Sequence, residues 1–173
     1  MQPDDTMDMT RAVPERRKIE LGLLENFVGM LLRAAYNEAF EDFARLLGSD
    51  TLKPGFFTVL TLVALNPGIT QVEIGREARR DKSSVTKALR QMEDEGLIRR
   101  VRLEDDRRSY ASYLTHEGAK LHRRMEIKAR EHIAHLDAVI GVERKRVLVE
   151  TLNDLIADLP PSAEESAGGT RAS

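Results

Sequence analysis

The chain has 173 residues, of which 41% are hydrophobic and 32% charged, and its formal net charge is −2. This balance predicts one soluble globular domain with short appendages, and the absence of cysteine excludes disulfides, thiolate metal sites and thiol nucleophiles. With no apolar run near the roughly 18–20 residues of a membrane span and no secretory signal, we expect a cytoplasmic protein without membrane contact.

The two ends of the chain are predicted to be disordered tails, over 1–14 and 160–173, because they are polar and rich in small residues. Residues 15–48 are predicted to form one long helix, since apolar residues recur at spacings of three and four. Apolar side chains extend well beyond a single stripe, which predicts burial against more than one neighbour.

Three shorter helices are expected next, over 53–65, 70–79 and 83–95. The second begins with a capping box in which Thr70 and Glu73 satisfy each other's backbone N–H groups. Asp81 or Ser83 caps the third, and Gly96 stands where a left-handed residue ends a helix.

The periodicity then changes to partial two-residue alternation over 97–103 and 109–114, on either side of a charged turn, which predicts a β-hairpin. Helical spacing returns over 116–140 and, after Gly141, over 142–159. The fold class expected is therefore mainly α with a small β-hairpin, in the order of a winged helix-turn-helix flanked by longer helices.

The helix over 83–95 carries the pattern expected of a DNA-recognition helix. Residues 79–91 hold five basic side chains and one acidic, a local field that matters more to a partner than the total charge. Val85, Leu89 and Met92 share one face and are expected to pack inward. The opposite face shows short hydroxyls and longer cations, which suit base edges and phosphates of a major groove.

Two further elements extend this surface. The helix beginning at Thr70 and Gln71 offers backbone N–H groups to a phosphate, and Arg108 at the hairpin tip is of the kind that enters a narrow minor groove. The predicted DNA-binding residues are Thr70, Gln71, Lys82, Ser83, Ser84, Thr86, Lys87, Arg90, Asp106, Arg107 and Arg108. The alternative for each charged segment is that its side chains are simply exposed to solvent and contact no DNA.

The stretch DKSSVTKALRQMEDEGLIRRVRLEDDRRSYASYLTHEG, residues 81–118, resembles the multiple antibiotic resistance regulator (MarR) family, and the resemblance covers about 20–159. It implies a homodimer that binds pseudo-palindromic double-stranded operator DNA and usually represses. Asp106 then orients the wing arginine, Arg108. The implied divisions are dimerisation helices over about 15–48 and 116–159, and a winged helix-turn-helix over about 53–115.

The resemblance also implies a pocket for a small-molecule effector, often an aromatic acid or its coenzyme A thioester. The candidate lining residues are Phe27, Met30, Arg33, Tyr36 and Phe56, with Arg33 as the carboxylate partner. The alternative is that the apolar members are ordinary core residues and that Arg33 makes a surface ion pair. The oxidant-sensing branch of the family, which depends on cysteine, is excluded.

His132 and His135 lie one helical turn apart, which could place two metal ligands on one face. Because His132 lies on the apolar stripe of its helix, we predict that it is an ordinary interface histidine. No metal or other cofactor is expected. No catalytic motif is recognisable, so an enzyme is not expected. Two other functions stay open: an architectural DNA binder with little sequence preference, and a winged-helix protein-interaction module that does not bind DNA.

Overall fold

The computed structural model describes residues 19–48, 55–104 and 108–159. Both predicted tails, 1–14 and 160–173, lie outside these ranges. The chain divides into two compact units, the first ending at Tyr36 and the second beginning at Asn37.

The first unit contains a short 3-10 helix, η1 (Gly22–Asn26), followed by the start of α1 (Val28–Leu47). The prediction of one helix over 15–48 is therefore wrong. Phe27 has an extended backbone with ψ 97°, which interrupts the helical hydrogen bonding between the two segments. The burial expected of this segment is found only toward its C-terminal end, where Leu47 is 8% exposed, whereas η1 has no buried residue and Leu23 is 81% exposed.

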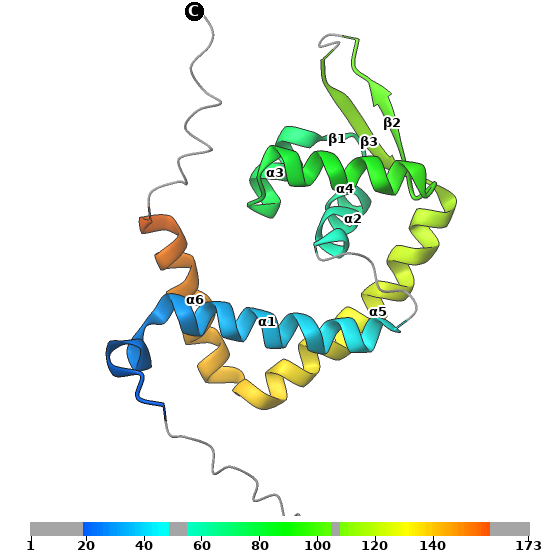
Figure 1. Ribbon diagram of the computed structural model, residues 1–173. Helices are drawn as coiled ribbons and strands as arrows, with labels where there is room; N and C mark the ends of the chain where they lie inside the picture. The colour runs from blue at the N-terminus through cyan, green and yellow to red at the C-terminus, as the bar shows by residue number, and fades with distance from the viewer. Residues whose placement is uncertain (1–18, 49–54, 105–107, 160–173) are drawn as a thin grey trace, which may run out of the picture. The chain divides into compact units, whose positions relative to one another are not determined.

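The second unit contains the winged helix-turn-helix that the sequence predicts. Its helices are α2 (Phe56–Leu65), α3 (Gln71–Ala78), α4 (Lys82–Asp94), α5 (His116–Ile140) and α6 (Val142–Asp158), and its strands are β1 (Ile69–Thr70), β2 (Ile98–Arg102) and β3 (Tyr110–Leu114). The mainly α fold class with a small β-hairpin is thus confirmed (Figure 1). α2 begins at Phe56 and has Gly55, with φ 81°, at its N-cap; residues 53 and 54 of the predicted helix lie outside the described residues.

The sheet has three antiparallel strands in the order β1-β3-β2, one more than the predicted hairpin. β1 contains only two residues, and Ile69 pairs with Ser112 of β3. On the other side of β3, Ile98 of β2 pairs with Leu114. Figure 1 shows the β2–β3 hairpin projecting beyond α4.

A single apolar core joins α2, α3, α4 and the first half of α5. Val59, Ile74 and Met125 come from three of these helices, and each has no exposed surface. The three residues of α4 expected to face inward, Val85, Leu89 and Met92, are at most 1% exposed. Burying these side chains orients α4, because only one of its faces is apolar.

The wing and α5 meet at a tightly packed corner. The Thr115 N–H donates to the Leu97 carbonyl at 3.0 Å, and the Thr115 hydroxyl donates to the Gly96 carbonyl at 2.6 Å. The same hydroxyl caps α5 by accepting from the Gly118 N–H at 3.0 Å. Gly118 is required here, since a Cβ at this position would lie 1.9 Å from the Leu97 carbonyl oxygen.

The last turns of α1 belong to the second unit and pack against its other helices through aromatic side chains. The Phe43 ring contacts the Phe57 ring of α2 edge-on, with centroids 5.3 Å apart, and lies at the same distance from the His132 ring of α5. By contrast, α6 has no buried residue. In the part of the chain that the structure describes, no helix is long and apolar enough to cross a bilayer.

Candidate nucleic-acid interface

The outward face of α4 is polar and partly cationic. Lys82, Ser83, Lys87 and Arg90 are exposed, whereas Ser84 and Thr86 are half-buried. Five of them were expected on this face from the spacing of the buried residues, and Lys82 was expected as a cation for phosphates; the structure leaves all six at least partly exposed. Lys87 and Arg90 therefore present their charges to solvent one and two turns beyond the start of the helix.

Asp81 is the N-cap of α4, which settles the choice between Asp81 and Ser83. Its Oδ1 accepts from the Ser84 N–H at 2.8 Å and from the Ser83 hydroxyl at 2.6 Å, and its Oδ2 accepts from the Ser84 hydroxyl at 2.5 Å. These bonds, first that from the Ser83 hydroxyl and then that from Ser84, hold the pKa of Asp81 well below its usual range. Asp81 is thus a fixed negative acceptor at neutral pH.

The capping box predicted for α3 is present. The Thr70 hydroxyl accepts from the Glu73 N–H, while Glu73 Oε2 accepts from the Thr70 N–H at 2.8 Å. That backbone bond is the largest cause of a lowered pKa at Glu73. The box fixes the direction from which Thr70 and the adjoining Gln71 approach α4.

A hydrogen bond between side chains sets α3 against α4. Gln71 Nε2 donates to the Thr86 hydroxyl oxygen at 2.6 Å, and that hydroxyl donates to the Lys82 carbonyl at 2.6 Å. The turn between the helices passes through Arg79, the only described non-glycine residue with positive φ, at 49°. Gln71 and Thr86 are therefore held against each other, and both were predicted to contact DNA.

The wing carries cations on both faces of the sheet. Arg100 bonds Glu93 of α4 through Nε, at 2.8 Å, and Nη2. Its guanidinium lies 5.5 Å from the Tyr110 ring centroid, and that of Arg99 lies 4.5 Å above the Tyr113 ring on the opposite face. The Arg100–Glu93 contact attaches the wing to α4, while the two arginine–tyrosine contacts lie within the hairpin.

A hollow of about 220 Å³ lies between α3, α4 and the wing. It is lined by Thr70, Gln71, Val72, Lys82, Leu89, Arg100, Arg108, Ser109, Tyr110 and Ser112. The structure thus brings together four predicted site residues from three elements: Thr70, Gln71, Lys82 and Arg108. Asp106 and Arg107 lie outside the described residues, and so does the predicted ion pair between Asp106 and Arg108.

Sequence reasoning expected Leu89 as a core residue and missed five others that line this hollow: Val72, Arg100, Ser109, Tyr110 and Ser112. The Ser112 hydroxyl is fully buried and, among the described residues, is the one buried side-chain polar atom without a hydrogen-bond partner. Cross-strand pairing puts Arg100 beside Ser112 and Arg102 beside Tyr110. Side chains alternate between the two faces of a strand, so Arg100 shares the face of the buried Ile98, which packs toward α4; this signal could have identified Arg100.

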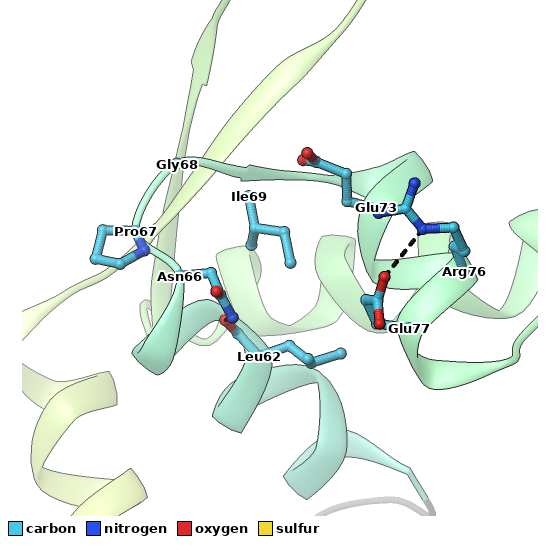
Figure 2. A pocket seen from close by; sticks show the side chains of 8 residues that line it. All are labelled: Leu62, Asn66, Pro67, Gly68, Ile69, Glu73, Arg76 and Glu77. Carbon is cyan, nitrogen blue, oxygen red and sulfur yellow. Dashed lines mark hydrogen bonds and ion pairs between the residues drawn. The ribbon is translucent and has the colours of Figure 1, made fainter. Parts of the chain in front are cut away.

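A second, larger hollow of about 460 Å³ lies between the end of α2, β1 and α3 (Figure 2). Glu73, Arg76 and Glu77 contribute charges to its wall, and Arg76 Nε bonds Glu77 Oε1 at 2.9 Å. Glu73 is already engaged by the Thr70 cap. None of the residues predicted for DNA or effector binding lines this hollow.

The candidate effector residues fall into different units. Phe27, Met30, Arg33 and Tyr36 belong to the first unit, where Phe27 is 54% and Tyr36 is 62% exposed. Phe56 belongs to the second unit and is a core residue, only 5% exposed. Arg33 is exposed and Met30 is half-buried.

The two histidines considered as metal ligands bind a carboxylate. His132 Nδ1 and His135 Nδ1 both contact Asp42 Oδ2, at 2.9 and 3.1 Å. In the described ranges, no group of three or more His, Asp or Glu side chains has a geometry suited to a metal ion. The pair instead connects α5 to α1 within the second unit.

Residues 52–110 match the MarR family model. The chain is 33% identical over 106 residues to a transcriptional regulatory protein for the hcr operon of Thauera aromatica, and the match spans 64% of that protein. It is 33% identical over 98 residues to an organic hydroperoxide resistance transcriptional regulator of Bacillus subtilis, covering 57% of this chain and 67% of that protein. The chain belongs to the MarR family.

Solved MarR-type structures share its fold. The repressor CouR bound to a 23-residue DNA duplex superposes with a TM-score of 0.73 at 29% identity, over 81% of this chain and 99% of CouR. CouR bound to p-coumaroyl-CoA gives 0.74 at 26% identity, over 82% and 100%. The winged helix-turn-helix of this MarR-family chain is therefore the fold of a DNA-bound relative.

Proposed function

We propose that this MarR-family protein is a homodimeric repressor that binds pseudo-palindromic operator DNA through α4 and the wing of each copy. The observation that carries the proposal is the convergence of Lys82, Arg108 and the N-terminus of α3 around one hollow, beside the exposed Lys87 and Arg90. Such an arrangement supplies cations for phosphates and polar groups for base edges. CouR, a relative with the same fold, has been solved on DNA.

A dimer is supported by the surface of α6. Its large apolar side chains Val142, Val147, Leu148, Val149 and Ile156 are all more than a third exposed. Val142, Val149 and Ile156 recur every seven residues and so share one side of the helix, and exposed apolar side chains grouped in this way are typical of an interface. With two-fold symmetry, the two copies of α4 would occupy half-sites about 34–36 Å apart on one side of the duplex.

We propose that a small aromatic acid, or its coenzyme A thioester, releases the protein from DNA. CouR in complex with p-coumaroyl-CoA supports this class of effector. The residues proposed to contact it are those of the first unit, Phe27, Met30, Arg33 and Tyr36, since Phe56 is buried in the core of the second unit. An effector that favours a spacing unsuited to the groove repeat would weaken DNA binding roughly 5–150-fold, for a coupling of about 1–3 kcal/mol.

The test is a mobility-shift titration of the full-length protein on the intergenic DNA beside its own gene, at several salt concentrations. Arg108→Ala is expected to lower affinity about tenfold and to reduce the salt dependence by about one phosphate contact. Arg130→Ala, which removes an exposed arginine of α5 paired with Glu126, is the matched control and should change neither. Equal effects of the two variants would contradict the assignment of the wing.

The same titration separates the other functions. An architectural DNA binder would hold scrambled DNA as tightly as the intergenic duplex, whereas a regulator should prefer its operator by about 10³ or more. A protein-interaction module would retard no duplex even at low salt.

A further inference from the structure

Three hydroxyl groups on the outward side of α4 already donate their hydrogens within the protein. Those of Ser83 and Ser84 donate to the Asp81 carboxylate at 2.6 and 2.5 Å. That of Thr86 donates to the Lys82 carbonyl at 2.6 Å. A carboxylate and a carbonyl can only accept, so each of these hydrogens points back toward the protein.

The direction of these bonds is fixed by the charge of Asp81. The hydrogen bonds from Ser83 and Ser84 hold the pKa of Asp81 well below its usual range, so the group remains ionised at neutral pH. A hydroxyl has one hydrogen and two lone pairs. Once its hydrogen is used, a serine can offer an outside partner only an acceptor, and donation to a carboxylate strengthens that acceptor.

We propose that Ser83 and Ser84 meet DNA as hydrogen-bond acceptors and read the exocyclic amino groups of adenine or cytosine, with Asp81 as the positioning residue that sets this polarity. The inference rests on the proposed function, because it requires α4 to enter the major groove. The hydrogen-bond donors of that groove are the adenine N6 and cytosine N4 amino groups. Phosphate oxygens, which only accept, are unsuitable partners for these two serines.

The neighbouring network has the same polarity. Thr86 accepts from Gln71 Nε2 at 2.6 Å in addition to donating to Lys82, so one lone pair remains. Side-chain donors on this face of α4 are then the exposed cations Lys82, Lys87 and Arg90. The hydroxyls of Ser83 and Ser84 form an acceptor surface between Lys82 and the two cations further along the helix.

The first experiment removes amino groups from the DNA. The operator selected by the full-length protein is resynthesised with purine in place of adenine, or pyrimidin-2-one in place of cytosine, at one position at a time. We expect the loss of one amino group in each half-site to weaken wild-type binding about tenfold. The serine variant that lacks the matching acceptor, Ser83→Ala or Ser84→Ala, should bind the modified duplex almost as tightly as the unmodified one. Its hydroxyl acceptor is already absent, so removing the amino group breaks no further hydrogen bond. Equal losses for wild type and both variants at every position would overturn the inference.

The second experiment reverses the polarity of one serine. In Asp81→Asn the amide oxygen still accepts from the Ser84 N–H, so the helix cap is retained, since asparagine caps as well as aspartate. The amide NH₂ replaces Oδ2 and donates to the Ser84 hydroxyl, whose hydrogen is then released toward the groove. The preferred base at that position should change from adenine or cytosine to guanine or thymine, which present acceptors. An unchanged preference would overturn the proposal.

The control for folding is circular dichroism with a thermal melt of each variant. Should Asp81→Asn not fold, the alanine variants on the modified duplexes decide the question alone. Failure of the proposed function is a different result, in which the wild-type protein selects no duplex. A selected operator that tolerates the loss of every amino group contradicts only the acceptor inference.

Discussion

The Asp42 carboxylate accepts hydrogen bonds from three side chains. His132 and His135 of α5 contact its Oδ2, and Arg45 of α1 donates to its Oδ1 at 3.0 Å. The hydrogen bonds from His132, His135 and Arg45, in that order, lower the pKa of Asp42 from 3.8 to about 2. A carboxyl with a lowered pKa in the folded state stabilises the protein at pH values above its unfolded pKa.

We expect Asp42→Asn to be less stable than wild type at pH 7, because the charged partner of both histidines is removed. The difference in free energy of unfolding should persist down to about pH 4 and disappear as the pH falls from 3.8 toward 2, where wild-type Asp42 also becomes neutral. Urea unfolding at a series of pH values measures it. Glu41→Gln, at an exposed neighbour on α1, should show no such convergence.

At the residue scale, sequence reasoning located side chains better than it assigned their bonds. The three-residue spacing of His132 and His135 correctly put both on one face of α5, but Asp42 lies 90 positions from His132, and no local pattern connects them. Ser83 and Ser84 were placed on the outward face. The direction of their hydrogen bonds could not be read, because it depends on which residue caps α4.

The corner between the wing and α5 depends on the missing side chain of Gly118. The obstacle to a larger residue is the backbone carbonyl of Leu97, which the Thr115 N–H holds in place at 3.0 Å. A flexible side chain could move aside, but this carbonyl can move only together with the end of α4 and the start of β2. The backbone of α5 at Gly118 therefore packs directly against the Leu97 carbonyl, with no room for a side chain between them.

Gly118→Ala should lower the free energy of unfolding by about 1–3 kcal/mol or more, since the added methyl group overpacks the corner. Gly29→Ala in α1 is the matched control. Its added Cβ would have its nearest neighbour at 3.6 Å, and alanine is favoured over glycine in a helix by roughly 0.5–1 kcal/mol. Thermal or urea unfolding should give shifts of opposite sign, and equal shifts would contradict the role given to Gly118.

At the element scale, strong local signals gave correct helices and weak ones did not. The capping box of Thr70 and Glu73 and the stop at Gly141 set boundaries that the structure confirms. β1 was missed because two residues are too few to show alternation. The break at Phe27 was missed because apolar spacing continues through it, while a backbone turn there leaves no mark on that spacing.

The whole molecule exposes more apolar surface on α6 than a soluble monomer usually does. Leu148 is 42% exposed, whereas Leu152 and Leu155 on the same stripe are half-buried. On the opposite side of the helix, Arg146 bonds Glu150 at 2.8 Å. The helix thus has one charged face and one largely apolar face, and the apolar face is the one that the proposed dimer would cover.

Leu148→Asp is expected to convert the proposed dimer into monomers, because a buried charge without a partner costs several kcal/mol, or a hundredfold or more in dissociation constant. Sedimentation velocity over a range of concentrations measures the change. Asn153→Asp adds the same charge at an exposed position of α6 and should leave the assembly intact. A Leu148→Asp protein that sediments as the wild type does would exclude α6 from the interface.

The Gly118 corner has a mechanical consequence for such an assembly. α5 has 25 residues, which makes it about 37 Å long at 1.5 Å per residue. Its first turn packs tightly against the base of the wing at Gly118. Tilting α5 by roughly ten degrees would sweep its far end through about 6 Å, nearly two base-pair steps of a duplex. In the proposed dimer, a small tilt of α5 on effector binding would therefore change the spacing of the two copies of α4 by more than one base-pair step.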